Sequence, residues 1–141
     1  MKLNYTDYVS LLDLRKRGYN LEQEGVLDRS HFDNLEDAVN DFMFNVVQSI
    51  YNLFLSYHSR EVTDAFFEDM KSDDLTGKAL DFKQRLKLAL IEQAIYIYDT
   101  GDSNTASYNQ ERQERSPYAP KAVAELWDIL TRNMTLNKSN S

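Results

Sequence analysis

The chain has 141 residues, of which 42% are hydrophobic and 12% aromatic, so it is long enough for one globular domain and too short for two comfortable ones. Its four glycines and two prolines are too few for the many tight turns of a β-sandwich or barrel, and we therefore expect helices. The net charge of −7 argues against a protein that binds nucleic acid through phosphate contacts. The absence of cysteine excludes disulfides, thiolate metal ligands and cysteine nucleophiles.

The first element that the sequence predicts is a short helix over residues 6–16. Thr6 and Asp7 can cap its start, and Gly18 suits its end. The same N-terminal stretch, MKLNYTDYVSLL, lacks the continuous apolar run of a secretion signal. No window of the chain approaches the roughly 18 uncharged apolar residues of a membrane span. We therefore expect a protein of the cytoplasm that makes no contact with a membrane.

The clearest helical pattern of the sequence covers residues 33–57. Its apolar residues recur three and four positions apart: Leu35, Ala38, Val39, Phe42, Val46, Ile50, Phe54 and Tyr57. We expect Ser30 to cap this helix, with Asp33 completing an imperfect capping box. A helix of this length measures about 37 Å, and we expect it to be the spine of the domain. Seven acids and one base, Arg29, lie between Glu22 and Asp41, and a solvated helix face is the ordinary explanation of such a run.

Two further helices are predicted between residues 60 and 100. Ser59 can cap a short helix within residues 60–71, where Val62, Phe66 and Met70 recur at a spacing of four. The stretch 78–100 carries one apolar stripe and further apolar residues on the adjoining faces. We therefore expect this helix to be apolar nearly all round, central in the fold, and ended by Gly101.

A polar stretch separates these elements from the last predicted helix. Residues 101–116 contain no Leu, Ile, Val, Met or Phe and cannot build a core, so we predict a polar arm or loop over 101–117. A final helix over 120–133 begins with Pro120 in its first turn. The predicted fold is all-α, a small helical bundle of four to five helices with one long polar loop. The helical domain spans 1–134, and 135–141 form a flexible tail.

The apolar stripes also predict which residues form the core. We expect its centre at these residues: Phe42, Val46, Ile50, Leu90, Ala94, Ile97, Leu126 and Trp127. Tyr96 and Tyr98 could stack on a ligand, but we expect them to be core rings whose hydroxyls reach the surface.

None of the common catalytic or metal-binding motifs is present. The stretch LTGKA has only one glycine before its lysine, too few for a P-loop, and there is no GxGxxG, HExxH, EF-hand loop or GxSxG. Asp28, His31, Asp33 and Asp37 have the composition of a metal site, but helix capping explains them better, and their spacing matches no ligand pattern. His31 and His58 lie at opposite ends of the long helix and cannot share a metal within one chain. We expect no catalysis, no cofactor and no metal.

Two classes of function remain open at this point. One is an assembly component whose surfaces are its function. The other is an enzyme or regulator whose site no single-sequence motif reveals. A regulator of this class without catalytic activity would be a small cytoplasmic helical regulatory or protein-interaction module. The absence of catalytic motifs favours the assembly component.

The second half of the chain carries an ordered pattern of small and polar residues. An apolar helix, LKLALIEQAIYIYDTG, precedes the polar stretch and the segment SPYAPKAVAELWDIL. Over about residues 30–133 this order of parts resembles the head–tail connector proteins of tailed bacteriophages, also called adaptor or head-completion proteins. The features of that family fall on these residues: Ala89, Gln93, Tyr96, Gly101, Ser116, Tyr118, Ala119 and Ala122.

The resemblance implies a virion structural protein that is assembled in the host cytoplasm and contains no catalytic site. Copies of the chain would form a homo-oligomeric ring of about twelve subunits beneath the phage portal protein, with a head-closure protein on the tail side. DNA would pass through the channel without specific binding, because a channel lined with acids repels phosphates. The predicted partner-binding residues lie in and beside the polar arm: Tyr108, Arg112, Arg115, Tyr118 and Lys121.

Overall fold

The computed structural model describes residues 1–101 and 116–132, and it shows an all-α fold. Its elements in chain order are the 3-10 helix η1 (Tyr5–Asp7) and the α-helices α1 (Leu11–Arg15), α2 (Leu35–Leu55), α3 (Arg60–Asp69), α4 (Gly77–Thr100) and α6 (Pro120–Thr131). The described part thus contains five α-helices and no strand, which confirms the predicted all-α bundle. Residues 102–115 of the predicted arm and 135–141 of the predicted tail lie outside the described residues.

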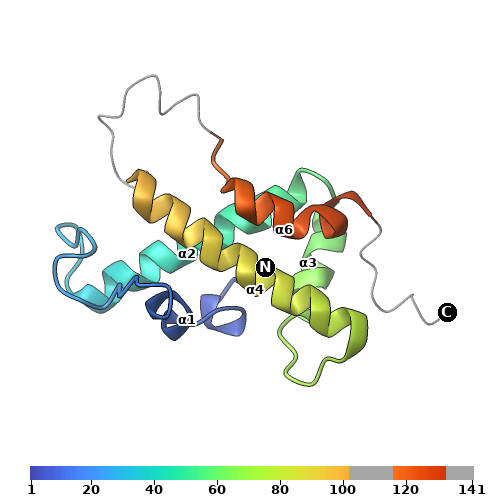
Figure 1. The fold of residues 1–141 in the computed structure, drawn as a ribbon, viewed down its shortest axis with the longest axis horizontal. Helices are drawn as coiled ribbons and strands as arrows, with labels where there is room; N and C mark the ends of the chain where they lie inside the picture. The colour runs from blue at the N-terminus through green and yellow to red at the C-terminus, as the bar shows by residue number, and fades with distance from the viewer. Residues whose placement is uncertain (102–115, 133–141) are drawn as a thin grey trace.

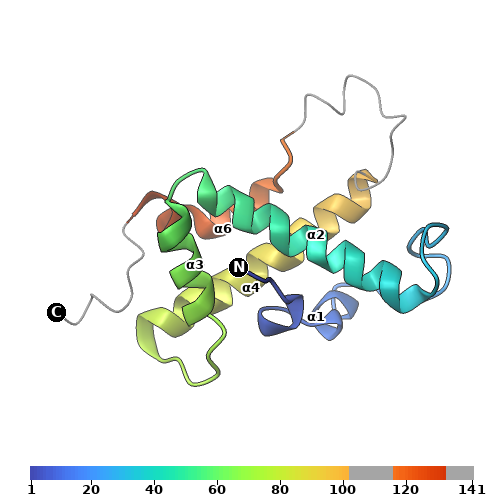
Figure 2. The ribbon, with the colours of Figure 1, turned by 180° about the vertical axis from the view of Figure 1, so that it is seen from behind.

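The two long helices, α2 and α4, cross one another and organise the bundle (Figures 1 and 2). α4 contacts α6 most extensively, then α2, and it also touches α1, so α4 is the central helix. α6 lies beside α4 and near the end of α2, and α3 packs against α2 (Figures 1 and 2). The expectation that the 78–100 helix is central is therefore confirmed, and α4 at 24 residues is longer than α2 at 21.

An aromatic cluster forms the densest part of the core, and Phe67 is its centre. The fully buried Phe67 ring contacts four other rings, at centroid distances of 5.1 to 5.8 Å across the cluster: Tyr8, Tyr51, Phe54 and Phe66. All four contacts with Phe67 are edge-to-face, an arrangement that aromatic quadrupoles favour. The cluster joins Tyr8, directly after η1, to the consecutive helices α2 and α3, which lie much later in the sequence.

The start of α2 differs from the sequence expectation. Asn34, not Ser30, is the N-cap, and its side-chain oxygen accepts a hydrogen bond from the Asp37 amide at 2.8 Å. The backbone amide of Ser30 donates instead to the Asp28 carboxylate at 2.9 Å, within a turn of the preceding loop. Ser30 and Asn34 are both residue types that cap helices well. Ser30 belongs to the turn with Asp28, so Asn34 caps the helix. The predicted caps and ends at Ser59, Gly101 and Pro120 are confirmed.

The predicted helix over residues 6–16 is wrong, because the chain forms two short pieces there. η1 is capped by Asn4, and the chain then becomes extended at Ser10, which caps α1 through a reciprocal capping box with Asp13. The interruption places Tyr8 in the core, where its hydroxyl donates to the Phe67 carbonyl oxygen at 3.0 Å. A contact between positions so far apart in the sequence overrides the local helical pattern.

The predicted core is correct except at Trp127. The other seven residues are buried, whereas the Trp127 side chain is 49% exposed. On α6 the inward face is taken by Leu126, Ile129 and Leu130. Successive residues of a helix point about 100° apart, so Trp127 is turned away from the core that Leu126 enters. Leu88 on α4 is 46% exposed for the same reason, which corrects the expectation that this helix is apolar nearly all round.

Candidate interaction surface

The junction between α4 and α6 is held by a buried amide. Gln93 of α4 is fully buried, and its Nε2 donates to the Pro117 carbonyl oxygen at 3.0 Å. Its Oε1 accepts a hydrogen bond from the Ala119 amide at 2.8 Å. Burying an unpaired amide is costly, so a buried glutamine with both ends bonded fixes the backbone that it contacts. Gln93 therefore sets where the chain approaches α6.

A second side chain of α4 binds the same segment. The Tyr96 hydroxyl donates to the Ser116 carbonyl oxygen at 2.6 Å, and the Ser116 hydroxyl accepts from the Tyr118 amide at 3.0 Å. We call the contacts of Gln93 and Tyr96 with residues 116–119 the α4 latch. Because α4 ends at Gly101, the latch holds Ser116 close to the end of α4 and so keeps together the two chain ends that flank residues 102–115.

Small residues allow the two helices of this junction to pack closely. Ala89 of α4 and Ala122 of α6 are fully buried, and Ala119 is 3% exposed. Tyr96 and Tyr98 are half-buried rings; Tyr98 packs edge-to-face against Tyr19 at a centroid distance of 5.8 Å. The residues on which the phage-connector resemblance depends are therefore mostly those that build the α4–α6 junction and the latch.

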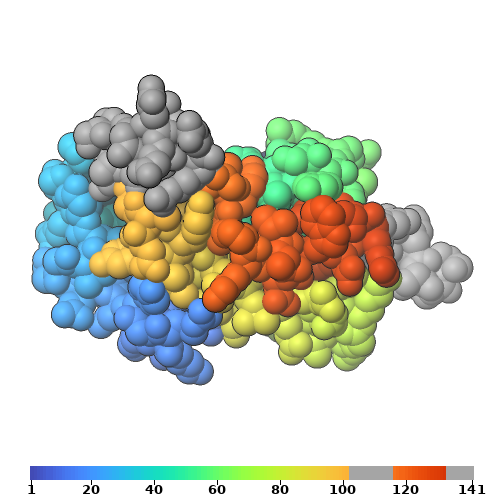
Figure 3. Space-filling view, turned by 45° about the horizontal axis from the view of Figure 1, so that its top comes forward, coloured from blue at the N-terminus to red at the C-terminus, as the bar shows by residue number. Residues whose placement is uncertain are grey.

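An exposed aromatic pair lies at the other end of α6. Trp127 meets Tyr57, which follows α2, edge-to-face at a centroid distance of 6.0 Å, and the two side chains are 49% and 44% exposed. In the space-filling view α6 lies at the surface beside α4 rather than beneath another described element (Figure 3). We call Tyr57 and Trp127 the aromatic patch. Two large aromatic side chains that are exposed and in contact with each other form an apolar patch, which is a feature of interaction sites.

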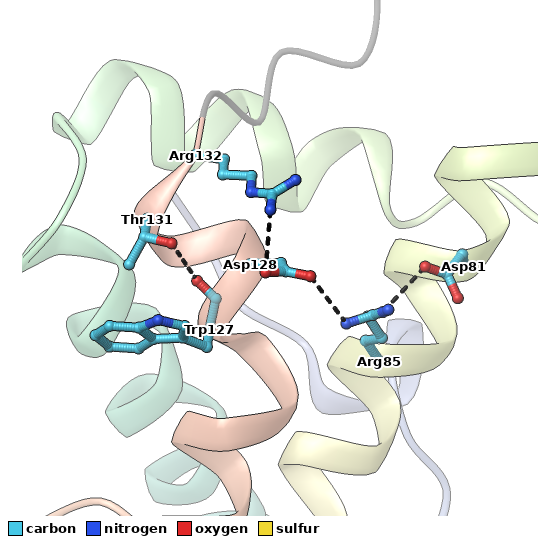
Figure 4. Close-up of polar contacts among 6 residues, drawn as sticks. All are labelled: Asp81, Arg85, Trp127, Asp128, Thr131 and Arg132. Carbon is cyan, nitrogen blue, oxygen red and sulfur yellow. Dashed lines mark hydrogen bonds and ion pairs between the residues drawn. The ribbon is translucent and has the colours of Figure 1, made fainter.

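Neighbouring polar contacts hold the aromatic patch in place. His58 Nε2 lies 3.2 Å from the Ile129 carbonyl oxygen, which joins the end of α2 to the last turn of α6. The Thr131 hydroxyl donates to the Trp127 carbonyl oxygen at 2.8 Å (Figure 4). These bonds attach the patch to two helices, so its rings are presented by rigid elements.

A small charged group borders the patch on α6. Asp128 is turned toward Arg85 of α4, 4.0 Å away, and Arg85 also bonds Asp81 at 3.0 Å (Figure 4). Arg132 lies 3.9 Å from Asp128, and its side chain is 74% exposed. An exposed pair at that distance contributes about 0–1 kcal/mol, so the charge of Arg132 is available to a partner.

A groove lies between the N-terminal segment and the first turns of α2. It consists of two adjoining hollows of about 410 and 540 Å³ that share Tyr5, Glu36 and Asn40. Its other apolar and charged lining residues include Lys2, Leu3, Leu11, Glu22, Leu35, Val39 and Phe44. Burial, together with the negative charges of Glu22 and Glu36, raises the pKa of Tyr5. We call this feature the N-terminal groove; its lining combines apolar residues with two acids, Glu22 and Glu36, and one base, Lys2.

The residues considered for a metal site do not come together as one. Asp28 and His31 line a separate hollow of about 220 Å³ with Asp41, whereas Asp33 and Asp37 do not line it. Within residues 1–101 and 116–132, no group of three or more histidine, aspartate or glutamate side chains is placed to hold a metal ion. His58 lies at the far end of α2 and is bonded to α6.

The structure describes two of the five predicted partner-binding residues. Tyr118 is half-buried against the core, and Lys121 is exposed in the first turn of α6. Tyr108, Arg112 and Arg115 lie outside the described residues. Sequence reasoning missed the aromatic patch because it placed Trp127 in the core. Spacing gave no signal for it, because Val123, Leu126, Trp127 and Leu130 also form a regular apolar stripe, and only packing selects the face of Leu126, Ile129 and Leu130.

Comparisons with protein families, with curated proteins and with solved structures found no match for the chain. None of the helices in the described part is long and apolar enough to cross a membrane.

Proposed function

We propose that the chain is a head–tail connector of a tailed bacteriophage, a virion structural protein that forms a homo-oligomeric ring beneath the portal protein. The observation that carries this proposal is the α4 latch. The resemblance depends on Gln93, Tyr96, Ser116 and Ala119. Gln93 is bonded to Ala119 and Tyr96 to Ser116, although a long polar stretch separates the two pairs in the sequence. A pattern of residues that forms one structural unit is better support than the same residues scattered over the surface.

The latch also gives the polar arm a role in this function. It holds Ser116 near the end of α4 and so brings together the described residues on either side of 102–115. Tyr108, Arg112 and Arg115 in that stretch are of the residue types most enriched in binding hot spots. In the proposed ring these residues, with Tyr118 and Lys121 beside them, contact a neighbouring subunit or the portal.

The charge of the chain fits passage of DNA through the ring. A net charge of −7 repels phosphates, and the acids between Glu22 and Asp41 are mostly exposed on the loop and the first turns of α2. A channel with this charge lets DNA move toward the tail-side head-closure protein without being held.

A second function is supported by the aromatic patch. Exposed Trp127 and Tyr57 would serve equally in a small cytoplasmic helical regulatory or protein-interaction module, since such residues anchor many kinds of interface. The two functions differ in whether the chain assembles into a ring.

Electron microscopy and mass measurement of the protein, alone and mixed with a candidate portal protein, test the proposal. We expect rings or ring-capped portals with the native chain, and their loss with Arg112→Ala combined with Arg115→Ala. The matched control is Lys71→Ala with Lys78→Ala, which removes two basic side chains that flank the loop before α4, at the opposite end of that helix from Gly101. A chain that stays monomeric with every portal tested would overturn the connector function and favour the interaction module.

A further inference from the structure

The aromatic patch has the properties of a binding anchor. Single exposed apolar residues are common on protein surfaces, but Trp127 and Tyr57 touch each other and are each nearly half exposed. Tryptophan and tyrosine are the residues most often found at the centre of interfaces, where they bury a large area with few rotatable bonds. A hollow in a partner could cover both rings and remove them from water together.

The N-terminal groove is a concave surface with apolar residues in its lining. Leu11, Leu35 and Val39 are among these residues, and Phe44, which also lines it, is 46% exposed. A hollow with apolar lining residues can take an aromatic ring and shield it from water, which is the main source of affinity for such a contact.

The charges beside the two surfaces are also complementary. Glu36 lines both hollows of the groove and has no ion pair with any residue in 1–101 or 116–132. Glu22 lines one hollow but is already paired with Arg15, and Lys2 at the outer hollow partly offsets the acids. On the patch side Asp128 lies 4.0 Å from Arg85 and 3.9 Å from Arg132, and Arg132, whose side chain is 74% exposed, is the positive charge that can meet Glu36.

The two surfaces lie at opposite ends of α2 and cannot meet within one chain. The groove includes Asn40 near the start of this helix, whereas Tyr57 follows its end, about 25 Å away at the usual helical rise. Contact between different surfaces of identical chains is heterologous, and repeated contacts of this kind close into a ring or continue as a filament.

We infer that the aromatic patch of one copy docks into the N-terminal groove of the next copy, with Arg132 facing Glu36 of its neighbour. This contact would join neighbouring subunits of the proposed ring. It rests on the proposed function in one respect, that the groove is filled by a second copy of the chain.

Disulfide trapping tests the contact directly, because the native chain has no cysteine. Copies carrying Asn40→Cys in the groove are mixed with tagged copies carrying Thr131→Cys beside the patch, and oxidised. We expect a cross-linked heterodimer at a yield at least about tenfold above that of the control pair, in which Ala65→Cys on the exposed face of α3 replaces Thr131→Cys. Equal yields from the two pairs would overturn the inference.

Charge reversal shows whether the trapped contact is the one inferred. Arg132→Glu in the Thr131→Cys copy should lower the yield about tenfold, and Glu36→Arg in the partner copy should restore it. A loss that the second reversal does not restore contradicts the pairing of Arg132 with Glu36.

Fluorescence of the native chain gives an independent measurement, since Trp127 is its single tryptophan. Its emission should shift to shorter wavelength as the protein concentration rises, because the indole leaves water, and the Arg132→Glu variant should show no shift over the same range. An emission maximum that is independent of concentration, up to the concentration that gives cross-links, would contradict docking of the indole.

The two proposals fail in distinguishable ways. Rings seen on the portal without the Asn40–Thr131 cross-link would leave the connector function standing and place the subunit contact elsewhere. The cross-link and its charge-reversal rescue without portal binding would leave the contact standing and remove the connector function.

Discussion

The aromatic cluster around Phe67 and the α4–α6 junction hold the same bundle together by different means. The cluster consists of the large buried rings of Tyr8, α2 and α3, and it loses water from a large apolar area. The junction consists of small buried residues and the α4 latch, in which one glutamine bonds to backbone on both sides. Ring packing in the cluster is weakly directional. The hydrogen bonds of the latch require defined distances and angles, so they fix the position of residues 117–119.

This difference indicates a division of roles. Burial of rings supplies stability but tolerates small shifts, so it is suited to joining the helices of the domain. Directional bonds of a buried amide contribute less net free energy but fix geometry, so they are suited to holding Ser116 and Ala119 where α6 begins. The four predictions that follow test this division, from the largest expected effect to the smallest.

Truncating the centre of the aromatic cluster should have the largest effect. We expect Phe67→Ala to lower the free energy of unfolding by about 3–5 kcal/mol, because it removes a fully buried ring and leaves a cavity among four others. Denaturant unfolding followed by circular dichroism measures the change. Phe44→Ala, at a ring that is 46% exposed, is the matched control and should cost about 1 kcal/mol or less. Similar losses for the two variants would mean that Phe67 is not central.

Removing the latch without changing its shape should cost less but act locally. We expect Gln93→Met to lower the free energy of unfolding by about 1–3 kcal/mol, because it leaves the Ala119 amide and the Pro117 carbonyl without their partner. Hydrogen exchange at the Ala119 amide should quicken more than exchange in α2.

The control for the latch is Gln48→Met, which removes an exposed bond to Asn52 on α2 and should change stability by about 0.5 kcal/mol or less. If exchange in α2 and at Ala119 quickened together, the latch would be part of the general core rather than a local device.

The capping box of α1 should contribute a smaller, pH-dependent amount. Partial burial of Asp13 opposes its ionisation, but the hydrogen bonds with Ser10 and the neighbouring Lys87 outweigh burial and lower its pKa. A lowered pKa means that the folded state favours the carboxylate. The stabilisation is therefore present at neutral pH and is lost as the pH falls from the ordinary aspartate pKa of about 4 through the lowered value.

We expect Asp13→Asn to cost about 1 kcal/mol at neutral pH and progressively less below pH of about 4. Thermal unfolding of the native and variant chains across this range measures the difference. Asp33→Asn, at an exposed aspartate outside any helix, should show no such convergence. A difference that stays constant to low pH would show that the carboxylate charge is not the cause.

The smallest expected effect on the isolated chain is that of Arg132→Glu. Its side chain is 74% exposed and only 3.9 Å from Asp128, so we expect a change of about 0.5 kcal/mol or less in the free energy of unfolding. Thermal unfolding of dilute protein measures it. A large loss would mean that Arg132 supports the fold, and its effect on assembly could then not be attributed to a contact between copies.

The positions of the helices follow from the sequence by itself, because spacing and caps are local. The apolar stripe of α2, the stop at Gly101 and the start at Pro120 need only neighbouring residues to be interpreted. Composition and the absence of motifs likewise favour a helical assembly component, although that function remains a proposal.

Only the tertiary structure decided which side of each helix meets the core and which of two equivalent local choices is made. Trp127 and Leu126 are neighbours with the same hydrophobic character, and packing of α6 on α4 buries one and exposes the other. The contact of Tyr8 with Phe67 divides the first predicted helix, and Gln93 becomes a latch because Pro117 and Ala119 return to it. Periodicity identifies residues that share a face, but contacts between distant segments determine what that face meets, so the groove and the aromatic patch could not be found from spacing alone.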